Sequence, residues 1–250
     1  MNRALLLFFL LSSFSKAFAS SGPTNFQLGS APIPYPSFTV GSADNSLGGT
    51  YLHISEGTAD LSGAGLDYKG RYAPTSFISV GFEMPFNYLS GDLGADFNSG
   101  TLKMYNATPM VNTQIQLWKS GEFSAIAFAG INFGYGHATI TQSTGDITMT
   151  LRLVSAPMGV QLGIPISHGV SVAPFYFYTR GLGGIATFDS SQGKTSTRIP
   201  SFSTQSYGLD VIIPKKHLSI GTLLQSTLQA AQKMNTLSLS IAWLFGGSVK

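Results

Sequence analysis

Apolar and polar residues alternate one by one along much of this chain. Residues 78–84 are ISVGFEM, and residues 237–245 are LSLSIAWLF. Similar alternation occurs at 111–117, 147–153 and 160–164. Because successive side chains of a β-strand point to opposite faces, a period of two predicts strands with one apolar and one polar face. The pattern favours a sheet whose two faces meet different surroundings.

Ten strands of this kind are expected, and short and longer connections alternate between them. They cover residues 48–55, 59–72, 75–86, 105–118, 122–136, 146–164, 169–180, 202–213, 217–227 and 236–245. The longer polar loops are expected near 87–104, 137–145, 181–201 and 228–235. An even strand number with short turns on one side and longer loops on the other is typical of bacterial outer-membrane barrels. The sequence therefore predicts an all-β fold, a closed antiparallel up-and-down transmembrane β-barrel of about ten strands, with eight as the alternative.

Composition agrees with such a barrel. Charged residues make up 10% of the chain, against roughly 25% in soluble domains. The hydrophobic share is 43%, yet no segment beyond the N-terminal region has 18 consecutive apolar residues, as a transmembrane helix would. The chain has no cysteine, and a closed barrel can be stable without disulfides because it has no free strand edge. The net charge of +3 does not indicate nucleic-acid binding, because Lys and Arg form no basic stripe.

The N-terminal region has the features of a signal peptide. Arg3 provides a positive charge, the apolar run ALLLFFLL follows, and AFA is a small-x-small cleavage site. We therefore expect residues 1–19 to be removed on export, residues 20–43 to form an extended Pro-rich tail, and residues 44–250 to form the barrel. The expected location is the cell outer membrane of a Gram-negative bacterium.

Charged residues gather on one face of several expected strands. In residues 66–72, LDYKGRY, the three charges lie on one parity and two tyrosines lie on the other. A charge that faces lipid at the midplane costs roughly 2–4 kcal/mol, so charges are expected to face the lumen. Six charges are expected there, where they could pair with one another: Asp67, Lys69, Arg71, Glu83, Arg152 and Asp210. The alternative is a half-buried soluble sheet that carries these charges on its solvent face.

The apolar parity changes within residues 146–164. Up to Leu153 the odd residues are apolar, whereas from Val160 onward the even residues are. We interpret this change as a β-bulge near Pro157, because a bulge adds one residue and tolerates proline. On that interpretation, Leu151 and Leu153 face outward and Arg152 faces inward.

The last strand resembles the C-terminal strand of bacterial outer-membrane β-barrel proteins. Residues 237–245 end in Phe245, and in those proteins a terminal aromatic residue is recognised by the barrel-assembly machinery; here GGSVK follows it. As a pattern, the whole mature chain is similar to the small members of that group, which have about 8–10 strands. The resemblance implies outer-membrane lipids and the barrel-assembly machinery as partners, and a monomer. No nucleic-acid partner is expected.

Motifs for catalysis or cofactor binding are weak. GKTS at 193–196 lacks the first glycine of a P-loop, whose place is taken by Phe188. The four histidines show no HExxH spacing, and there is no GxSxG elbow. For Asp92, Asp96 and Asn98, an ordinary polar loop is favoured over a calcium site. Ten-stranded outer-membrane proteases are a family of similar size, but adjacent Asp-Asp and His-Asp pairs like those of their active site are absent here. We expect no enzyme activity, catalytic residue, cofactor or metal site.

The expected function is that of an integral outer-membrane barrel with a mostly plugged polar lumen and a structural or surface-interaction role through its long external loops. The alternative is a narrow porin-like channel for ions or small solutes. Gly81, Gly163, Gly208 and Gly221 have inward parity and favour the channel, because residues without a side chain would leave space near the wall.

Overall fold

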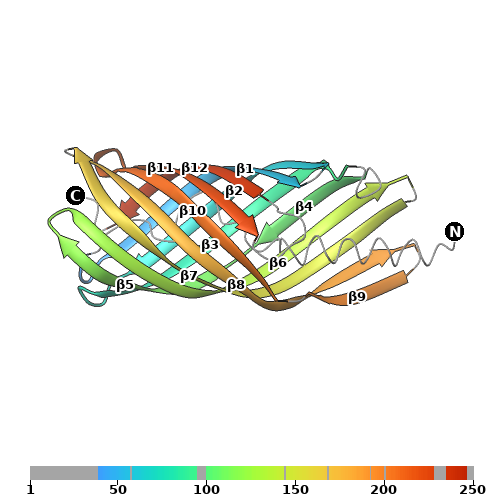
Figure 1. Cartoon of the computed structure of the whole chain (residues 1–250), viewed down its shortest axis with the longest axis horizontal. Coiled ribbons are helices and arrows are strands. Elements are labelled where there is room, and N and C mark those ends of the chain that lie inside the picture. Colours follow the sequence, from blue (N-terminus) through green and yellow to red (C-terminus); the bar gives the residue numbers. More distant parts are fainter. Residues whose placement is uncertain are drawn as a thin grey trace.

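The computed structural model describes residues 39–246 apart from 57, 95–99, 144, 168, 192, 200 and 228–234. The expected signal peptide, most of the Pro-rich tail and the predicted loop at 228–235 therefore fall outside the described residues, except for Asn235. The described elements are β1 (Ala43–Glu56), β2 (Ala59–Tyr72), β3 (Ile78–Asp92), β4 (Thr101–Ala107), β5 (Met110–Ser120), β6 (Phe123–Gln142), β7 (Gly145–Ser167), β8 (Val170–Ser190), β9 (Gly193–Ile199), β10 (Phe202–Ile213), the 3₁₀ turn η3 (Pro214–Lys216), β11 (Leu218–Thr227) and β12 (Asn235–Gly246). The strands wind around one axis into an elongated barrel (Figure 1).

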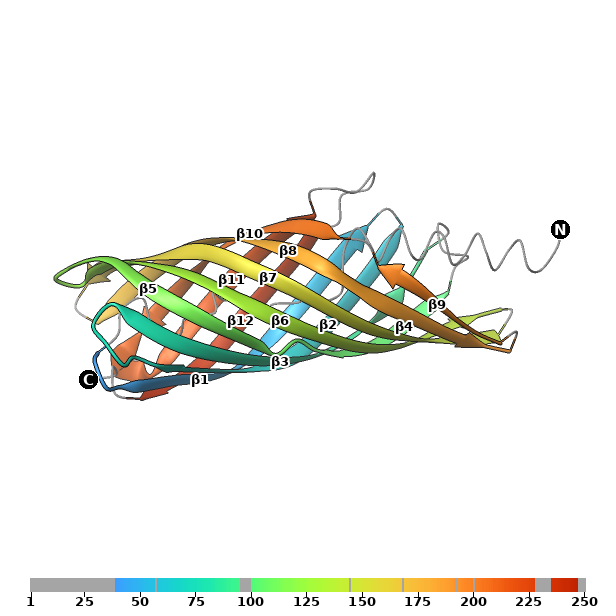
Figure 2. The same ribbon diagram turned by 90° about the horizontal axis from the view of Figure 1, so that it is seen from below.

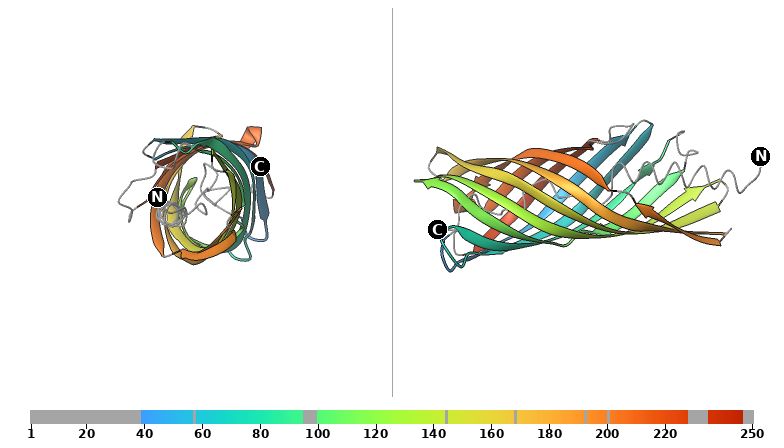
Figure 3. Two further views of the ribbon diagram at one scale, coloured as in Figure 1. Left: turned by 90° about the vertical axis from the view of Figure 1, so that its right-hand side faces the viewer. Right: turned by 60° about the horizontal axis from the view of Figure 1, so that its bottom comes forward.

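The sheet closes on itself. The first and last strands pair antiparallel from Asp44↔Gly246 to Ser55↔Asn235. β4 and β5 both pair with β3 and β6, and β9 and β10 both pair with β8, so each couple acts as one interrupted strand. The twelve segments therefore form ten barrel strands, which confirms the predicted fold class and strand number. A view along the axis shows the closed wall (Figure 3).

Proline explains the interruption between β4 and β5. Pro109 has no N–H to donate, so the ladder cannot continue through it unchanged. Hydrogen bonds nevertheless hold both sides of the break: the Thr108 N–H donates to Pro85 O at 3.3 Å, and the Phe133 N–H donates to Pro109 O at 2.9 Å. The wall is locally irregular here and remains connected.

Several strands extend beyond their predicted ends, on the side away from the short turns. The predicted loops at 137–145 and 181–201 are largely strand. β6 and β7 remain paired as far as Gln142↔Gly145, and β8 and β9 as far as Ser190↔Gly193. The predicted loop at 87–104 is likewise shortened by β3 and β4. Figure 2 shows these hairpins projecting at one end of the barrel. Polar residues suggested loops there, but an outer strand face in contact with water is also polar.

The predicted bulge at Pro157 is wrong. The β6–β7 register runs without a shift past this residue, and odd residues of β7 stay inward on both sides of it. The irregularity lies on β8 instead, where Val154 pairs with Gly183 and Ser155 with Gly181, which leaves Leu182 as the extra residue. Gly183 has φ of 125°, a conformation that glycine adopts easily.

An exposed apolar belt surrounds the half of the barrel nearer the short turns. It is built from outward side chains of every barrel strand, among them Leu66, Val80, Ile115, Ile131, Val160, Leu209, Ile220 and Ile241. Exposed aromatic residues lie at the short-turn edge, including Tyr72, Trp118, Phe123 and Trp243. Tyr88 and Tyr105 lie at the other edge, with ring centroids 4.8 Å apart. Such a belt between aromatic edges is characteristic of a lipid-facing barrel surface.

Candidate functional site

The charged residues expected in the lumen from β2 and β3 are buried inside the barrel. Asp67, Lys69 and Arg71 follow one another on the inner face of β2, and Glu83 lies beside them on β3. None of the four is more than 5% exposed. The Nζ atom of Lys69 is 3.2 Å from Asp67 Oδ2 and 3.8 Å from Glu83 Oε1. One ammonium group therefore balances two carboxylates on neighbouring strands.

A fifth inner charge, Asp44, was not anticipated from the sequence. Arg71 donates a 2.6 Å hydrogen bond from a terminal guanidinium nitrogen to Asp44 Oδ2. Asp44 lies on β1, whose predicted start was residue 48, so the residue fell between the expected tail, 20–43, and the first expected strand. Asp44 and Ser46 are both even-numbered inner residues of β1, and this shared parity was the one sequence signal for the inward position of Asp44.

Asp210 completes the group, which we call the inner charge cluster: Asp44, Asp67, Lys69, Arg71, Glu83 and Asp210. Asp210 is 3% exposed on β10, and its charge interacts with Lys69. The cluster contains four acidic and two basic residues, a formal excess of two negative charges. Buried charges are costly unless they are paired and hydrogen-bonded. The cluster therefore links β1, β2 and β3 by specific ionic contacts inside the barrel.

Arg152 is not part of this cluster, and its predicted lumen position is wrong. It is exposed on the outer face of β7, between Tyr135 on β6 and Ile185 on β8 in the register. Its neighbours Leu151 and Leu153 are buried inside the barrel. The sequence pattern misled because the apolar belt ends at this part of β7. From Arg152 back to Thr148 the outer face of β7 is polar and its inner face is apolar, the reverse of the arrangement within the belt.

Neutral polar side chains fill the space next to the cluster. Ser79 Oγ donates to Gln114 Oε1 at 3.1 Å, and Gln114 Nε2 donates to Asn112 Oδ1 at 2.8 Å. A Cβ atom on Gly81 would lie 2.5 Å from Asn112 Oδ1 and 2.7 Å from Gln114 Nε2. The glycine thus makes room for these two side chains. The expectation that Gly81 leaves an open space is wrong.

Aromatic side chains occupy another part of the same interior. Phe177 lies 6.0 Å from Phe128 and 6.1 Å from Phe175, measured between ring centroids. A Cβ atom on Gly208 would lie 2.5 Å from Phe175 Cζ, so this glycine also accommodates a neighbour. Sequence reasoning missed these rings because Tyr176 and Tyr178 alternate with Phe175 and Phe177, which makes both faces of the strand aromatic.

The half of the interior away from the short turns is largely apolar, although β11 and β12 add buried polar residues there, among them Gln225 and Thr236. A single cluster of buried residues lines it: Leu52, Ile54, Ala59, Leu61, Leu89, Leu93, Leu102, Met104, Ala138, Ile140, Met149, Leu151, Leu153, Ala186, Phe188, Ile199 and Phe202. We call it the inner apolar cluster. It adjoins the polar inner residues Asn87 on β3 and Ser155 on β7, and on β2 Gly63 and Gly65 separate it from Asp67. The barrel interior therefore has a charged and polar part, a small aromatic group, and an apolar part.

The described residues hold no group of three or more His, Asp or Glu side chains placed to bind a metal ion. Within the described ranges, no helix is long and apolar enough to cross a membrane. Asp92 is exposed at the end of β3. Asp96, Asn98 and His168 lie outside the described residues.

No family model and no curated protein matches this chain. Several solved structures resemble it over most of their lengths. The translocator domain of autotransporter NalP from Neisseria meningitidis matches with a TM-score of 0.52 and 8% identity, over 96% of this chain and 97% of that chain. The outer membrane protease OmpT from Escherichia coli matches with a TM-score of 0.53 and 9% identity, over 82% of this chain and 96% of that chain. The fold is that of an outer-membrane β-barrel. At these identities the likeness concerns the fold of the barrel alone.

Proposed function

We propose that this chain is an integral outer-membrane barrel with a closed interior, and that its role is structural or involves surface interactions at the end away from the short turns. The observation that carries the proposal is the filling of the interior. The inner charge cluster, the small aromatic group of Phe128, Phe175 and Phe177, and the inner apolar cluster are all buried. In a barrel only slightly wider than one with eight strands, side chains can occupy the lumen.

The apolar belt and its aromatic edges support membrane insertion of the described strands. A surface of this kind is expected to face lipid, since in water it would leave many large apolar side chains in contact with solvent. Cleavage after Ala19, assembly by the barrel-assembly machinery and a monomeric state belong to the same proposal. Cleavage rests on the N-terminal sequence pattern, and the other two rest on the resemblance to small outer-membrane barrels described above.

A narrow channel is the second candidate, and the charge balance of the interior gives it a defined property. Four acidic residues against two basic residues would favour cations over anions along any path past the cluster. The inner apolar cluster opposes such a path, because an ion that passes along it would lose hydration and meet few polar partners. The closed barrel is therefore the better supported function.

Single-channel recording in planar bilayers separates the two functions. We expect the purified full chain to show no steady conductance. Replacing both Lys69 and Arg71 by alanine leaves four inner acidic residues without their cations, which should draw in water and produce cation-selective openings. The matched control is Arg180→Ala, which removes an outward charge from β8 and should leave the recording unchanged. Large, stable openings of the unmodified protein would overturn the closed interior.

A further inference from the structure

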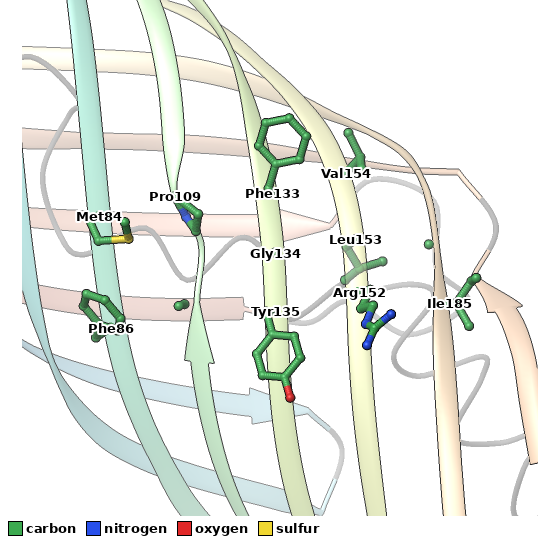
Figure 4. Close-up of a pocket in the computed structure, with 12 residues that line it drawn as sticks. Met84, Phe86, Pro109, Phe133, Gly134, Tyr135, Arg152, Leu153, Val154 and Ile185 are labelled. Atoms are coloured by element: carbon green, nitrogen blue, oxygen red, sulfur yellow. The ribbon is translucent and has the colours of Figure 1, made fainter. Parts of the chain in front are cut away.

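The outer wall carries an apolar groove at the irregular part of the sheet. It has a volume of about 680 Å³ and crosses β3, the β4–β5 break, β6, β7 and β8. Met84, Phe86, Phe133, Tyr135 and Ile185 line it with apolar and aromatic side chains (Figure 4). Phe86, Phe133, Tyr135 and Ile185 are exposed, so the groove opens on the outside of the barrel.

Its shape follows from two local features of the sequence. Pro109 breaks the strand between β4 and β5, and Ala107 and Pro109 place small side chains between the larger Phe86 and Tyr135. On the other side, next to the β8 irregularity, Gly184 lets β8 approach β7 closely, because a Cβ atom on it would collide with the carbonyl oxygen of Arg152. Small residues between large ones produce a furrow in an otherwise convex wall.

Arg152 is the one charged residue among the described residues that line the groove. Its side chain is exposed, and its outward neighbours in register are Tyr135 and Ile185, neither of which is acidic. None of the ion pairs between described residues includes it. Along β7, Val154 lies on the belt side of Arg152 and Thr150 lies on the polar side. Arg152 therefore lies at the edge of the apolar belt.

We propose that this groove binds one anionic membrane lipid, with an acyl chain against the apolar lining and the headgroup phosphate at Arg152. Three observations support this occupant. The groove lies on the wall that the belt exposes to lipid, its lining is almost wholly apolar, and its cation is placed at the polar edge of the belt. Arginine suits a phosphate because its planar guanidinium can donate two parallel hydrogen bonds.

A lipid fits these features better than a soluble anion or a protein segment. A soluble anion would make no use of the apolar lining beside Phe133 and Tyr135. A protein segment would have to bind within the wall that already faces acyl chains. The bilayer places a headgroup and its chain at this boundary without any additional partner.

Native mass spectrometry of the full chain in detergent tests the site. The protein is titrated with phosphatidylglycerol or with phosphatidylcholine of identical acyl chains, and the retained lipid is counted. We expect one retained phosphatidylglycerol in preference to phosphatidylcholine. Arg152→Gln should weaken that retention about fivefold, the effect of one cation near a headgroup. Ala107→Leu should fill the groove and reduce retention of both lipids.

The matched control is Arg180→Gln. Arg180 is also exposed on β8, but it does not line the groove, so its replacement removes the same charge from the same surface. Heat-modifiable migration confirms that each variant has folded. The proposal is overturned if Arg152→Gln and Arg180→Gln have equal effects, if the unmodified protein retains the two lipids equally, or if Ala107→Leu changes nothing.

Discussion

Arg71 and Asp44 form an ion pair of 2.6 Å between β2 and β1, and both side chains are completely removed from solvent. The two residues lie opposite each other in the register, so the pair spans adjacent strands next to the seam where β1 meets β12. A buried ion pair contributes little net stability compared with apolar residues of the same shape, but loss of one partner leaves a buried charge uncompensated.

The first prediction concerns this pair. Asp44→Ala should lower the free energy of unfolding by about 3–5 kcal/mol, because Arg71 then loses its partner in the interior. The double variant Asp44→Ala with Arg71→Ala should cost less than the sum of the two single variants. Reversible urea unfolding in lipid vesicles measures all three. Strict additivity would show that the two side chains do not depend on each other.

The second prediction concerns the lipid-facing side of the wall. Ile115→Arg places a charge in the apolar belt and should cost roughly 2–4 kcal/mol near the midplane. The control, Thr150→Arg, adds the same side chain to the outer face of β7 beyond the belt, and its cost should stay below about 0.5 kcal/mol. Unfolding in vesicles provides both values. Similar costs at the two positions would contradict the placement of the belt.

The third prediction tests the apolar part of the interior. Leu151 is 1% exposed within the inner apolar cluster, so Leu151→Ala should cost about 2–5 kcal/mol. Val160→Ala removes an outward side chain that is 43% exposed, and it should cost clearly less. If Leu151 faced outward, as the sequence pattern suggested, the two truncations would have comparable effects.

The fourth prediction uses a glycine that accommodates an aromatic ring. A Cβ atom on Gly181 would collide with the ring of Phe202, so Gly181→Ala should destabilise the barrel by about 1–3 kcal/mol. Phe202→Leu in the same chain should recover part of this loss. Gly49→Ala serves as the control, because the nearest atom to its Cβ would be 3.9 Å away. Thermal unfolding of the three variants in one detergent is the measurement, and a lack of recovery would contradict the proposed contact.

The fifth prediction concerns export. Cleavage after Ala19 should leave Ser20 as the first residue of the protein recovered from membranes. N-terminal sequencing of that material is the measurement. Retention of Arg3 in the assembled protein would contradict the signal-peptide interpretation.

The sequence alone was sufficient for the fold class. Alternation with a period of two, an even number of strands and a low share of charged residues led to a ten-stranded barrel, which the closure between β1 and β12 confirms. The inward placement of Asp67, Lys69 and Arg71 also followed from parity, because three successive odd positions of one strand must share a face. These inferences are local and depend only on strand geometry.

Parity alone does not say which face is inside when the surroundings of a strand change along its length. In β7, the odd residues from Met149 to Leu153 are large and apolar and those from Ser155 to Gly163 are small or polar, yet both groups lie on the inner face. The sequence pattern changes because the outer face of β7 leaves the apolar belt and becomes polar, while the register between β6 and β7 stays continuous. Only the tertiary structure could show this, and it moved Arg152 from the lumen to the outer wall.

Contacts between strands were likewise decided by the tertiary structure. Asp44 and Arg71 are 27 residues apart, and their pairing depends on the β1–β2 register. The outer groove forms because the break at Pro109 lies next to side chains from β3, β6, β7 and β8. The period of a sequence determines which way each side chain points, whereas the relative shift of neighbouring strands determines which side chains meet.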